Sequence, residues 1–203
     1  MAKQNEQIVT PIGVSSYPWL NYPDTRYNSD GEFKVSLILD KEQSTPLQEK
    51  INSVLEEAKK LVPKNKKANT HVPFEDELDD QEEPTGNVVF KFKRKYKIKT
   101  KDGSIIETFP RVFDSEGQVF GDEQIWGGSK MKVSADLVPY YVPALGIGVS
   151  LRLKAAQIIE LVSGGQGADA NTYGFKQETG YKTTPKVSSE DTNKTNEMEE
   201  EDF

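Results

Sequence analysis

The chain has 203 residues, of which 34% are hydrophobic, enough for one domain with a sizeable polar remainder. It contains no cysteine and one histidine, His71, which excludes disulfide frameworks, thiolate zinc sites and cysteine nucleophiles and leaves little room for histidine chemistry. The formal net charge of −7 argues, on its face, against a nucleic-acid partner.

The first half of the chain predicts two strands and a helix. Residues 8–20 predict an irregular strand, broken by Pro11 and Pro18. Residues 32–40 alternate between an apolar and a polar face, which is typical of a half-buried strand. Thr45-Pro46-Leu47-Gln48 then has the spacing of a capping box with proline at the first helical position, and apolar residues follow at helical spacing up to Pro63. We therefore predict one amphipathic helix over about residues 45–62.

A polar loop and a basic strand are predicted next. The loop, about residues 64–86, carries seven carboxylates and no base between positions 75 and 83. The strand, residues 88–101, carries seven bases and no acid between positions 91 and 101. Its lysines alternate with apolar residues, and Arg94 on the apolar side indicates a bulge or a strand rim. Asp102-Gly103 predicts a hairpin turn into a returning strand at residues 104–114.

Two further alternating strands complete the expected domain. They cover residues 130–137 and residues 146 to about 162. No period persists afterwards, so we expect a linker at 166–185 and a disordered acidic tail at 186–203, whose net charge is −5. Without this tail and the −7 block at 75–83, the remaining body carries +5. The overall acidity therefore hides a basic domain.

These elements favour a mostly β fold. One-sided alternation and short turns are typical of a small antiparallel barrel rather than a parallel α/β sheet. The OB-fold combines five strands with one inserted helix. We predict such a five-stranded antiparallel Greek-key barrel over residues 1–165, with one inserted α-helix, followed by the linker and tail.

Signatures of catalysis are missing from the sequence. Gly127-Gly128-Ser129-Lys130 lacks the upstream glycine of a phosphate loop and leads into a strand. His71 lies in the polar loop and is interpreted as a solvated side chain. The carboxylates at 75–83 have no spacing that would hold a cation. We predict no catalytic residue, no metal and no cofactor. We also predict no membrane span and no signal peptide, hence an intracellular protein.

The basic strand is the stronger functional lead. Lysines on one face of a strand stand ~6.6 Å apart and can follow a phosphodiester chain, while single-strand binders add aromatic rings on which bases stack. Phe90, Phe92 and Tyr96 oppose the lysines and are core candidates. Better stacking candidates lie at loops or strand ends: Tyr17, Trp19, Tyr22, Trp126, Tyr140 and Tyr141. Pro139 and Pro143 flank the last two, which either stack on bases or cap the barrel.

The last five residues, Glu199-Glu200-Glu201-Asp202-Phe203, combine negative charge with a terminal ring. An acidic segment can compete with DNA for lysines, and a terminal phenylalanine can anchor in a partner's apolar pocket. The alternative is a solubilising tail, which has no need to end in phenylalanine.

Several segments together resemble one family. They are KFK at 91–93, GGSKMKVSADLVPY at 127–140, GVSLRLKAAQIIELVSGG at 148–165 and the acidic end in Asp202-Phe203. They are similar to the single-stranded DNA-binding proteins of T-seven-type phages. The resemblance implies an OB-fold that coats single strands in phage DNA replication and recombination, in the cytoplasm of the infected bacterial host. It also implies a homodimer and a tail that covers the DNA cleft and contacts the phage DNA polymerase and helicase–primase.

Residue roles follow from the resemblance and from the basic faces of the strands. The resemblance assigns Tyr140 to base stacking, and Val142 replaces a family tryptophan, which weakens stacking or passes it to Tyr141 or Trp19. The predicted phosphate-binding residues are Lys91, Lys93, Lys95, Lys97, Lys130, Lys132 and Arg152. The predicted partner-binding residues are Glu199, Glu200, Glu201, Asp202 and Phe203.

The sequence thus predicts a non-enzymatic, sequence-independent binder of single-stranded DNA. An alternative is an acidic interaction protein or chaperone for basic partners, without DNA affinity, that uses the 75–83 block and the tail. A metal-dependent nuclease is a further alternative.

Overall fold

The computed structural model describes residues 5–60, 62–63 and 68–162. The predicted linker and acidic tail lie outside the described residues. The described chain forms one helix, α1 (Lys41–Lys59), and eleven strands. The strands are β1 (Glu6–Val9), β2 (Gly13–Asp24), β3 (Glu32–Leu39), β4 (Thr70–His71), β5 (Phe74–Leu78), β6 (Pro84–Lys95), β7 (Lys97–Lys99), β8 (Ile105–Glu107), β9 (Arg111–Phe113), β10 (Lys130–Val142) and β11 (Gly146–Glu160).

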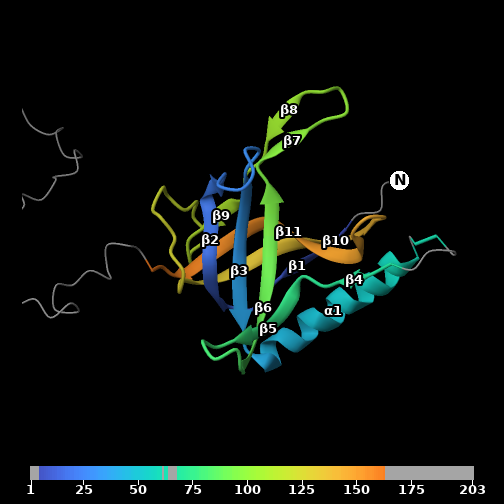
Figure 1. Cartoon of the computed structure of the whole chain (residues 1–203). Helices are drawn as coiled ribbons and strands as arrows, with labels where there is room; N and C mark the ends of the chain where they lie inside the picture. Colours follow the sequence, from blue (N-terminus) through green and yellow to red (C-terminus); the bar gives the residue numbers. More distant parts are fainter. Residues whose placement is uncertain (1–4, 61, 64–67, 163–203) are drawn as a thin grey trace, which may run out of the picture. The chain divides into compact units, whose positions relative to one another are not determined.

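Five of these strands pair in a ring (Figure 1). The order is β2, β3, β6, β11, β10 and back to β2, and α1 is inserted in the chain between β3 and β6. Two joins are short, with two residue pairs between β10 and β2 and two between β6 and β11. The predicted fold class, a mostly β OB-fold with one inserted helix, is confirmed.

One join differs from the predicted antiparallel barrel. β11 runs parallel to β6, with Leu151 beside Phe92 and Arg152 beside Lys93. A ring with an odd number of strands cannot alternate in direction all the way round. At least one parallel join is therefore unavoidable in a five-stranded ring.

The core lies inside this ring and under α1. The inward faces predicted from alternation are buried, because successive strand residues point to opposite sides of the sheet. Helix α1 packs against β6, β10 and β11. The largest fully buried side chains include Phe33, Leu37 and Leu39 of β3, Phe90 and Phe92 of β6, Met131 and Val133 of β10, and Leu151 and Leu153 of β11.

The helix begins earlier than the predicted residue 45. Asp40 is its N-cap, and the Asp40 carboxylate accepts a hydrogen bond from the Gln43 amide at 2.8 Å. The Thr45 hydroxyl instead donates to the Lys41 carbonyl at 2.8 Å, within the helix. Pro46 is tolerated near the exposed start, where its missing N–H deprives only one carbonyl of a helical bond.

The prediction of an acidic loop is wrong for residues 70–86, which form strands. Residues 70–86 contain β4, β5 and the start of β6, and β5 pairs antiparallel with β6. Phe74 and Leu78 are the apolar side chains of β5. The Phe74 ring packs on the Phe90 ring, with centroids 5.6 Å apart. His71 is in β4, and its Nε2 lies 2.8 Å from the carbonyl oxygen of Leu145.

The predicted basic strand is divided at Tyr96. β6 ends at Lys95, and β7 leaves the barrel to form a separate two-stranded sheet with β8, which stands away from the ring in Figure 1. The Tyr96 ring packs edge-on against the rings of Phe33 and Phe109, with centroids 5.9 and 5.5 Å apart. These contacts attach the base of the hairpin to the core. The predicted strand at 104–114 is likewise two strands, since β9 pairs with β11.

Candidate nucleic-acid interface

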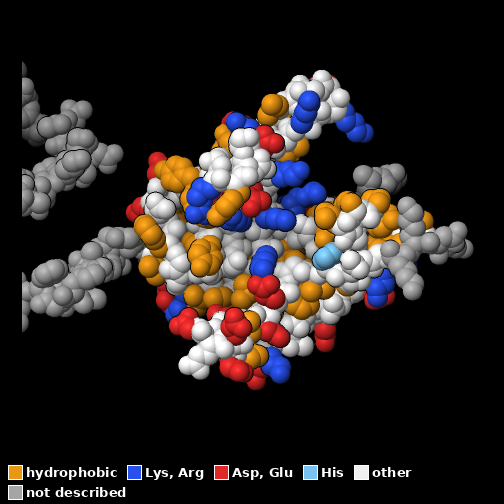
Figure 2. Space-filling view, in the orientation of Figure 1, with side chains coloured by type: hydrophobic (Ala, Val, Ile, Leu, Met, Phe, Trp, Pro, Cys, Tyr) orange, Lys and Arg blue, Asp and Glu red, His pale blue; other side chains and the backbone are white. Residues whose placement is uncertain are grey.

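A cleft of about 1010 Å³ crosses the outer faces of β3 and β6. It extends from the connection between β2 and β3 to the turn between β10 and β11. The cleft therefore runs across the strands, whereas the sequence suggested a track along one strand. Figure 2 shows basic side chains gathered on the upper part of this face.

The two ends of the cleft differ in chemistry. One end is charged, with basic side chains from β3, β6 and the connection that precedes β3: Arg26, Lys34, Lys91, Lys93 and Lys95. The other end is largely apolar, with side chains from the β10–β11 turn and from the segment between β4 and β5: Val72, Pro73, Val142, Leu145 and Val149. The two groups come from different elements and meet at Pro73, whose carbonyl accepts a hydrogen bond from the Lys91 amide at 2.9 Å.

A buried carboxylate organises the charged end. Asp24 is 3% exposed. Its oxygens accept from Arg26 Nε and Nη2 at 2.9 and 3.0 Å, and Lys34 Nζ lies 2.7 Å from Oδ2. These hydrogen bonds, with that of Arg26 the strongest, hold the pKa of the Asp24 carboxyl well below its usual range. Asp24 thus fixes two cations at the rim while it neutralises part of their charge.

Three tyrosines line the cleft. Tyr17 and Tyr27 are 79% and 89% exposed, and the Arg26 guanidinium lies over the Tyr27 ring, 5.7 Å from its centroid. Tyr17 has a φ of 48°, a left-handed conformation that is costly for an aromatic residue and coincides with the interruption of β2–β3 pairing. Tyr140 is half-buried at the apolar end.

The Tyr140 ring lies against a glycine. Tyr140 pairs with Gly148 on β11. A Cβ atom at Gly148 would lie 2.6 Å from the Tyr140 hydroxyl oxygen and 2.7 Å from the His71 carbonyl oxygen. The absence of a side chain at position 148 therefore makes room for the ring.

The other predicted stacking residues lie elsewhere. Tyr141 and Trp19 do not line this cleft. The Arg26 guanidinium covers one face of the Trp19 ring, 4.7 Å from its centroid. This cation–π contact occupies a surface on which a base would otherwise stack.

The predicted phosphate-binding residues also divide into groups. Lys91, Lys93 and Lys95 line the cleft, and the Arg152 backbone is beside Lys93 in the sheet. Lys97 lies beyond them on β7, with its Nζ 5.5 Å from the centroid of the Tyr96 ring.

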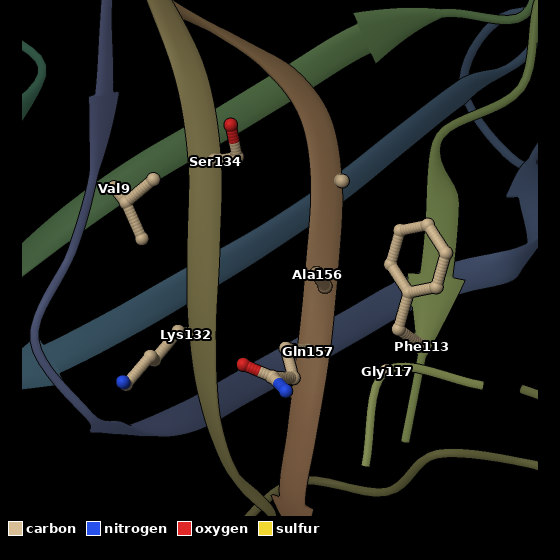
Figure 3. A pocket seen from close by; sticks show the side chains of 8 residues that line it. Val9, Phe113, Gly117, Lys132, Ser134, Ala156 and Gln157 are labelled. Atoms are coloured by element: carbon tan, nitrogen blue, oxygen red, sulfur yellow. The ribbon is translucent and has the colours of Figure 1, made fainter. Parts of the chain in front are cut away.

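The two lysines of β10 are not in the cleft. Lys130 Nζ forms an ion pair with Glu160 at 2.8 Å. Lys132 lines a different pocket of about 360 Å³, beside Val9 and Gln157, with Phe113 on its far side (Figure 3). The structure therefore does not bring these lysines together with those of β6.

Arg94, the one charged residue on the apolar side of β6, is a structural residue. Its Nε donates to the Thr108 hydroxyl at 2.9 Å, and burial, with the nearby charge of Arg152, lowers the pKa of its guanidinium. Thr108 in turn donates to the Lys95 carbonyl at 2.6 Å. These bonds tie the base of the β7–β8 hairpin to β6.

Sequence reasoning missed Arg26, Tyr27 and Lys34. The alternation of residues 32–40 already assigned Lys34 to the outer face of its strand. No local signal showed that this face adjoins that of β6, or that Asp24 would hold Arg26 beside it.

The described part of the chain has neither a cluster of metal-ligating side chains nor a helix that could cross a membrane. Within residues 5–60, 62–63 and 68–162, no group of three or more His, Cys, Asp or Glu side chains could hold a metal ion. No helix in this part of the chain is long and apolar enough to span a membrane. The predicted tail residues 199–203 lie outside the described residues.

Comparison with known proteins identifies the family. Residues 12–161 match the family model for "Single-stranded DNA-binding protein, Bacteriophage T7". The chain is 36% identical over 102 residues to the single-stranded DNA-binding protein of Escherichia phage T7, and 31% identical over 135 residues to that of Enterobacteria phage T3. These alignments cover 48% and 64% of this chain, and 43% and 57% of the two relatives.

Two solved structures share this fold. The crystal structure of gp2.5, a single-stranded DNA-binding protein encoded by bacteriophage T7, superimposes with a TM-score of 0.64 at 27% identity, over 83% of this chain and 98% of that one. The single-stranded DNA-binding protein of bacteriophage Enc34, solved with single-stranded DNA, shares the fold, with a TM-score of 0.56 at 17% identity, over 77% of this chain and 88% of that one. The family is named for binding rather than for a reaction, in agreement with the predicted binding protein. The chain belongs to the phage T7-type family of single-stranded DNA-binding proteins.

Proposed function

We propose that this chain binds single-stranded DNA without sequence preference, through the cleft across β3 and β6. The observation that carries the proposal is the division of the cleft into a charged end and an apolar end. A single strand presents phosphates along one edge and unpaired bases along the other. Such a ligand fits a surface that offers both cations and apolar and aromatic side chains.

Each end of the cleft has a role in this proposal. Lys91, Lys93, Lys95 and Lys34 contact phosphates and release counterions, so affinity falls steeply with salt. Tyr140 stacks on a base at the apolar end, and the exposed rings of Tyr17 and Tyr27 offer two more stacking surfaces. Arg152 and Lys97 extend the basic surface beside the cleft, towards the β7–β8 hairpin.

A titration of labelled oligonucleotides, followed by anisotropy and gel shift, tests the function. We expect binding of single strands of any sequence, a weaker shift of duplex DNA, and no cleavage with magnesium. Cleavage would support a nuclease instead. No shift of either DNA would overturn the proposal and favour an acidic interaction protein.

The acidic tail is proposed to act on the same cleft. Residues 186–203 carry a net −5 and can compete with DNA for the lysines. Deletion of residues 186–203 should therefore tighten binding to an oligonucleotide at low salt, and unchanged or weaker binding would contradict the competition.

The terminal ring is proposed to recruit phage replication proteins. Removal of Phe203 alone should leave DNA affinity nearly intact and weaken capture of the phage DNA polymerase and helicase–primase. If both partners are captured as before, the ring has no part in recruitment. We further propose that the chain forms a homodimer, and sedimentation of the full chain would test this oligomeric state. The homodimer is proposed to act in DNA replication and recombination, in the cytoplasm of the infected host.

A further inference from the structure

The β7–β8 hairpin, residues 97–107, begins beside the charged end of the cleft. Lys95 lines the cleft and is the last residue of β6, and β7 starts two residues later. The Tyr96 amide donates to the Gly31 carbonyl at 2.9 Å, and the Lys97 amide donates to the next carbonyl, that of Asp30, at 3.1 Å. These bonds join the hairpin to the connection between β2 and β3, which borders the same end of the cleft. Figure 2 shows basic side chains from this face up to the projecting hairpin.

The hairpin has a defined conformation at both ends. Tyr96 and Thr108 attach its base to the core and to β6. At the other end, the Thr100 amide donates to the Ser104 carbonyl at 2.8 Å, and the Ser104 hydroxyl donates to the Asp102 carboxylate at 3.1 Å. Between these ends, β7 and β8 form a sheet of their own. The hairpin is therefore an ordered projection whose two faces are available to a ligand.

The hairpin continues the basic sequence of β6 with three lysines. Lys97 and Lys99 lie on one face of β7, because strand residues two apart point the same way, and Lys101 is in the turn. Glu107 is opposite Lys97 in the sheet, and Asp102 bonds within the turn. Among the described residues, the ammonium groups of Lys99 and Lys101 have no ion-pair or hydrogen-bond partner. These two lysines therefore present uncompensated positive charge.

Apolar side chains accompany these cations. Ile105 is opposite Lys99, shares its face and is 65% exposed. Ile98 and Ile106 are paired on the other face and are 38% and 48% exposed. An isolated two-stranded hairpin is marginally stable in water, so a ligand that covers its apolar side chains stabilises it. The hairpin thus offers the same two chemistries as the cleft.

A single strand of DNA fits this combination. Its phosphates match the uncompensated lysines, and its unpaired bases present apolar faces to the isoleucines. A second copy of the hairpin is a poorer partner, because a two-fold contact would place its lysines against those of the first. From Lys97 to Lys101 the backbone spans about 13 Å, room for about four phosphates at the per-strand rise of a duplex and for fewer in an extended strand.

We infer that the β7–β8 hairpin is an arm of the DNA site, which binds the single strand where it leaves the charged end of the cleft and lengthens the footprint by about two to four nucleotides. This inference rests on the proposed function. It gives a role to the exposed isoleucines and to Lys99 and Lys101, which binding in the cleft alone leaves without one.

Oligothymidylates of increasing length test the inference. Against a strand of about 20 nucleotides, longer than one OB-fold covers, the variant Lys99→Ala/Lys101→Ala should bind on the order of tenfold more weakly than the wild type at about 0.1 M salt. The slope of log affinity against log salt should become less steep by about 1.4, since about 0.7 of a counterion is released per phosphate contact. Against a strand of about 5 nucleotides, which the cleft alone accommodates, the change should be less than about twofold.

The apolar contribution is tested separately. Ile105→Ser should weaken binding of the long strand without a change in the salt slope, because it removes an apolar contact and no charge.

A matched control removes the same charge elsewhere. Lys41→Ala/Lys50→Ala changes two exposed lysines of α1 that do not line the cleft. We expect this control to change the affinities for the long and the short strand equally and slightly. Melting temperatures of all variants verify that they are folded, and sedimentation reports their oligomeric state.

Four outcomes are distinguishable. A loss confined to the long strand, in the hairpin variants and not in the control, supports the inference. An equal loss at both lengths, or none, with wild-type binding intact, overturns the inference and leaves the proposed function standing. Altered sedimentation of the hairpin variants without a length-dependent loss would mean that the hairpin contacts a second copy, and it overturns the inference as well. Absence of single-strand binding by the wild-type chain overturns the proposed function itself.

Discussion

β6 and β10 carry the same pattern but lie in different surroundings. Both alternate lysines with buried apolar residues, and in both the lysines face outwards. On β6 the lysines line the cleft, although Lys91 is ion-paired with Glu75 at 2.7 Å. On β10 neither lysine lines it: Lys130 pairs with Glu160, and Lys132 adjoins the pocket at Val9. The alternation of polar and apolar residues thus determines which side chains face outwards. The order of strands in the ring determines which side chains of other strands lie beside them.

The largest effect on DNA binding is expected from replacement of the β6 lysines. Lys91→Ala/Lys93→Ala/Lys95→Ala should weaken single-strand binding on the order of 100-fold at about 0.1 M salt, because about 0.7 of a counterion is released per phosphate contact. The slope of log affinity against log salt should become less steep by about 2. Titrations at several salt concentrations measure both quantities.

The β10 lysines supply the control for that experiment. Lys130→Ala/Lys132→Ala should leave the salt slope within error of the wild-type value. An equal loss of slope in the two variants would show that DNA binding follows the net charge of the protein and not the cleft.

A smaller effect is expected from the aromatic residues at the end of β10. Tyr140→Ala should cost about 1–3 kcal/mol of binding free energy, the range for one stacked base. Tyr141→Ala, one residue further along and outside the cleft, should cost much less. Tyr140→Phe should bind like the wild type, since it keeps the ring; if it binds as weakly as the alanine variant, stacking is not the source of the loss.

The smallest effect on DNA binding, and a clear one on stability, is expected at the charged rim. The pKa of Asp24 is lowered in the folded chain, so its ionised form stabilises the fold above the ordinary value of 3.8, and this contribution is lost as pH falls through the folded-state value. Asp24→Asn should therefore lower the melting temperature at neutral pH, and the gap to the wild type should narrow on acidification below 3.8. A gap that is constant with pH would mean that shape, not charge, is responsible.

The sequence was sufficient for the fold class and for the inner faces of the long strands. Phe33, Phe92 and Leu151 are buried as their alternation predicted. The hairpin at 75–83 could not be foreseen, because Leu78 is the one apolar residue in this block and such an acidic run is typical of a loop. The helix start was misplaced because Asp40 and Thr45 are both good caps, and only the observed Asp40 bond decides between them.

The site was predicted in part. Lys91, Lys93, Lys95 and Tyr140 line the cleft as expected. Lys130, Lys132, Tyr141 and Trp19 do not, because local periodicity contains no information about which strands become neighbours. Arg26 and Tyr27 are missed for the same reason, since a long-range ring closure places their connection beside β6.

The contact between Tyr140 and Gly148 has a consequence for how this protein can evolve. Any side chain at position 148 would collide with the Tyr140 ring and with the His71 carbonyl. A lineage that replaces the glycine must therefore change the aromatic residue too, or reposition β4. Positions 140 and 148 should vary together among relatives, and a sequence that carries a large residue at 148 should have a smaller residue than tyrosine at 140.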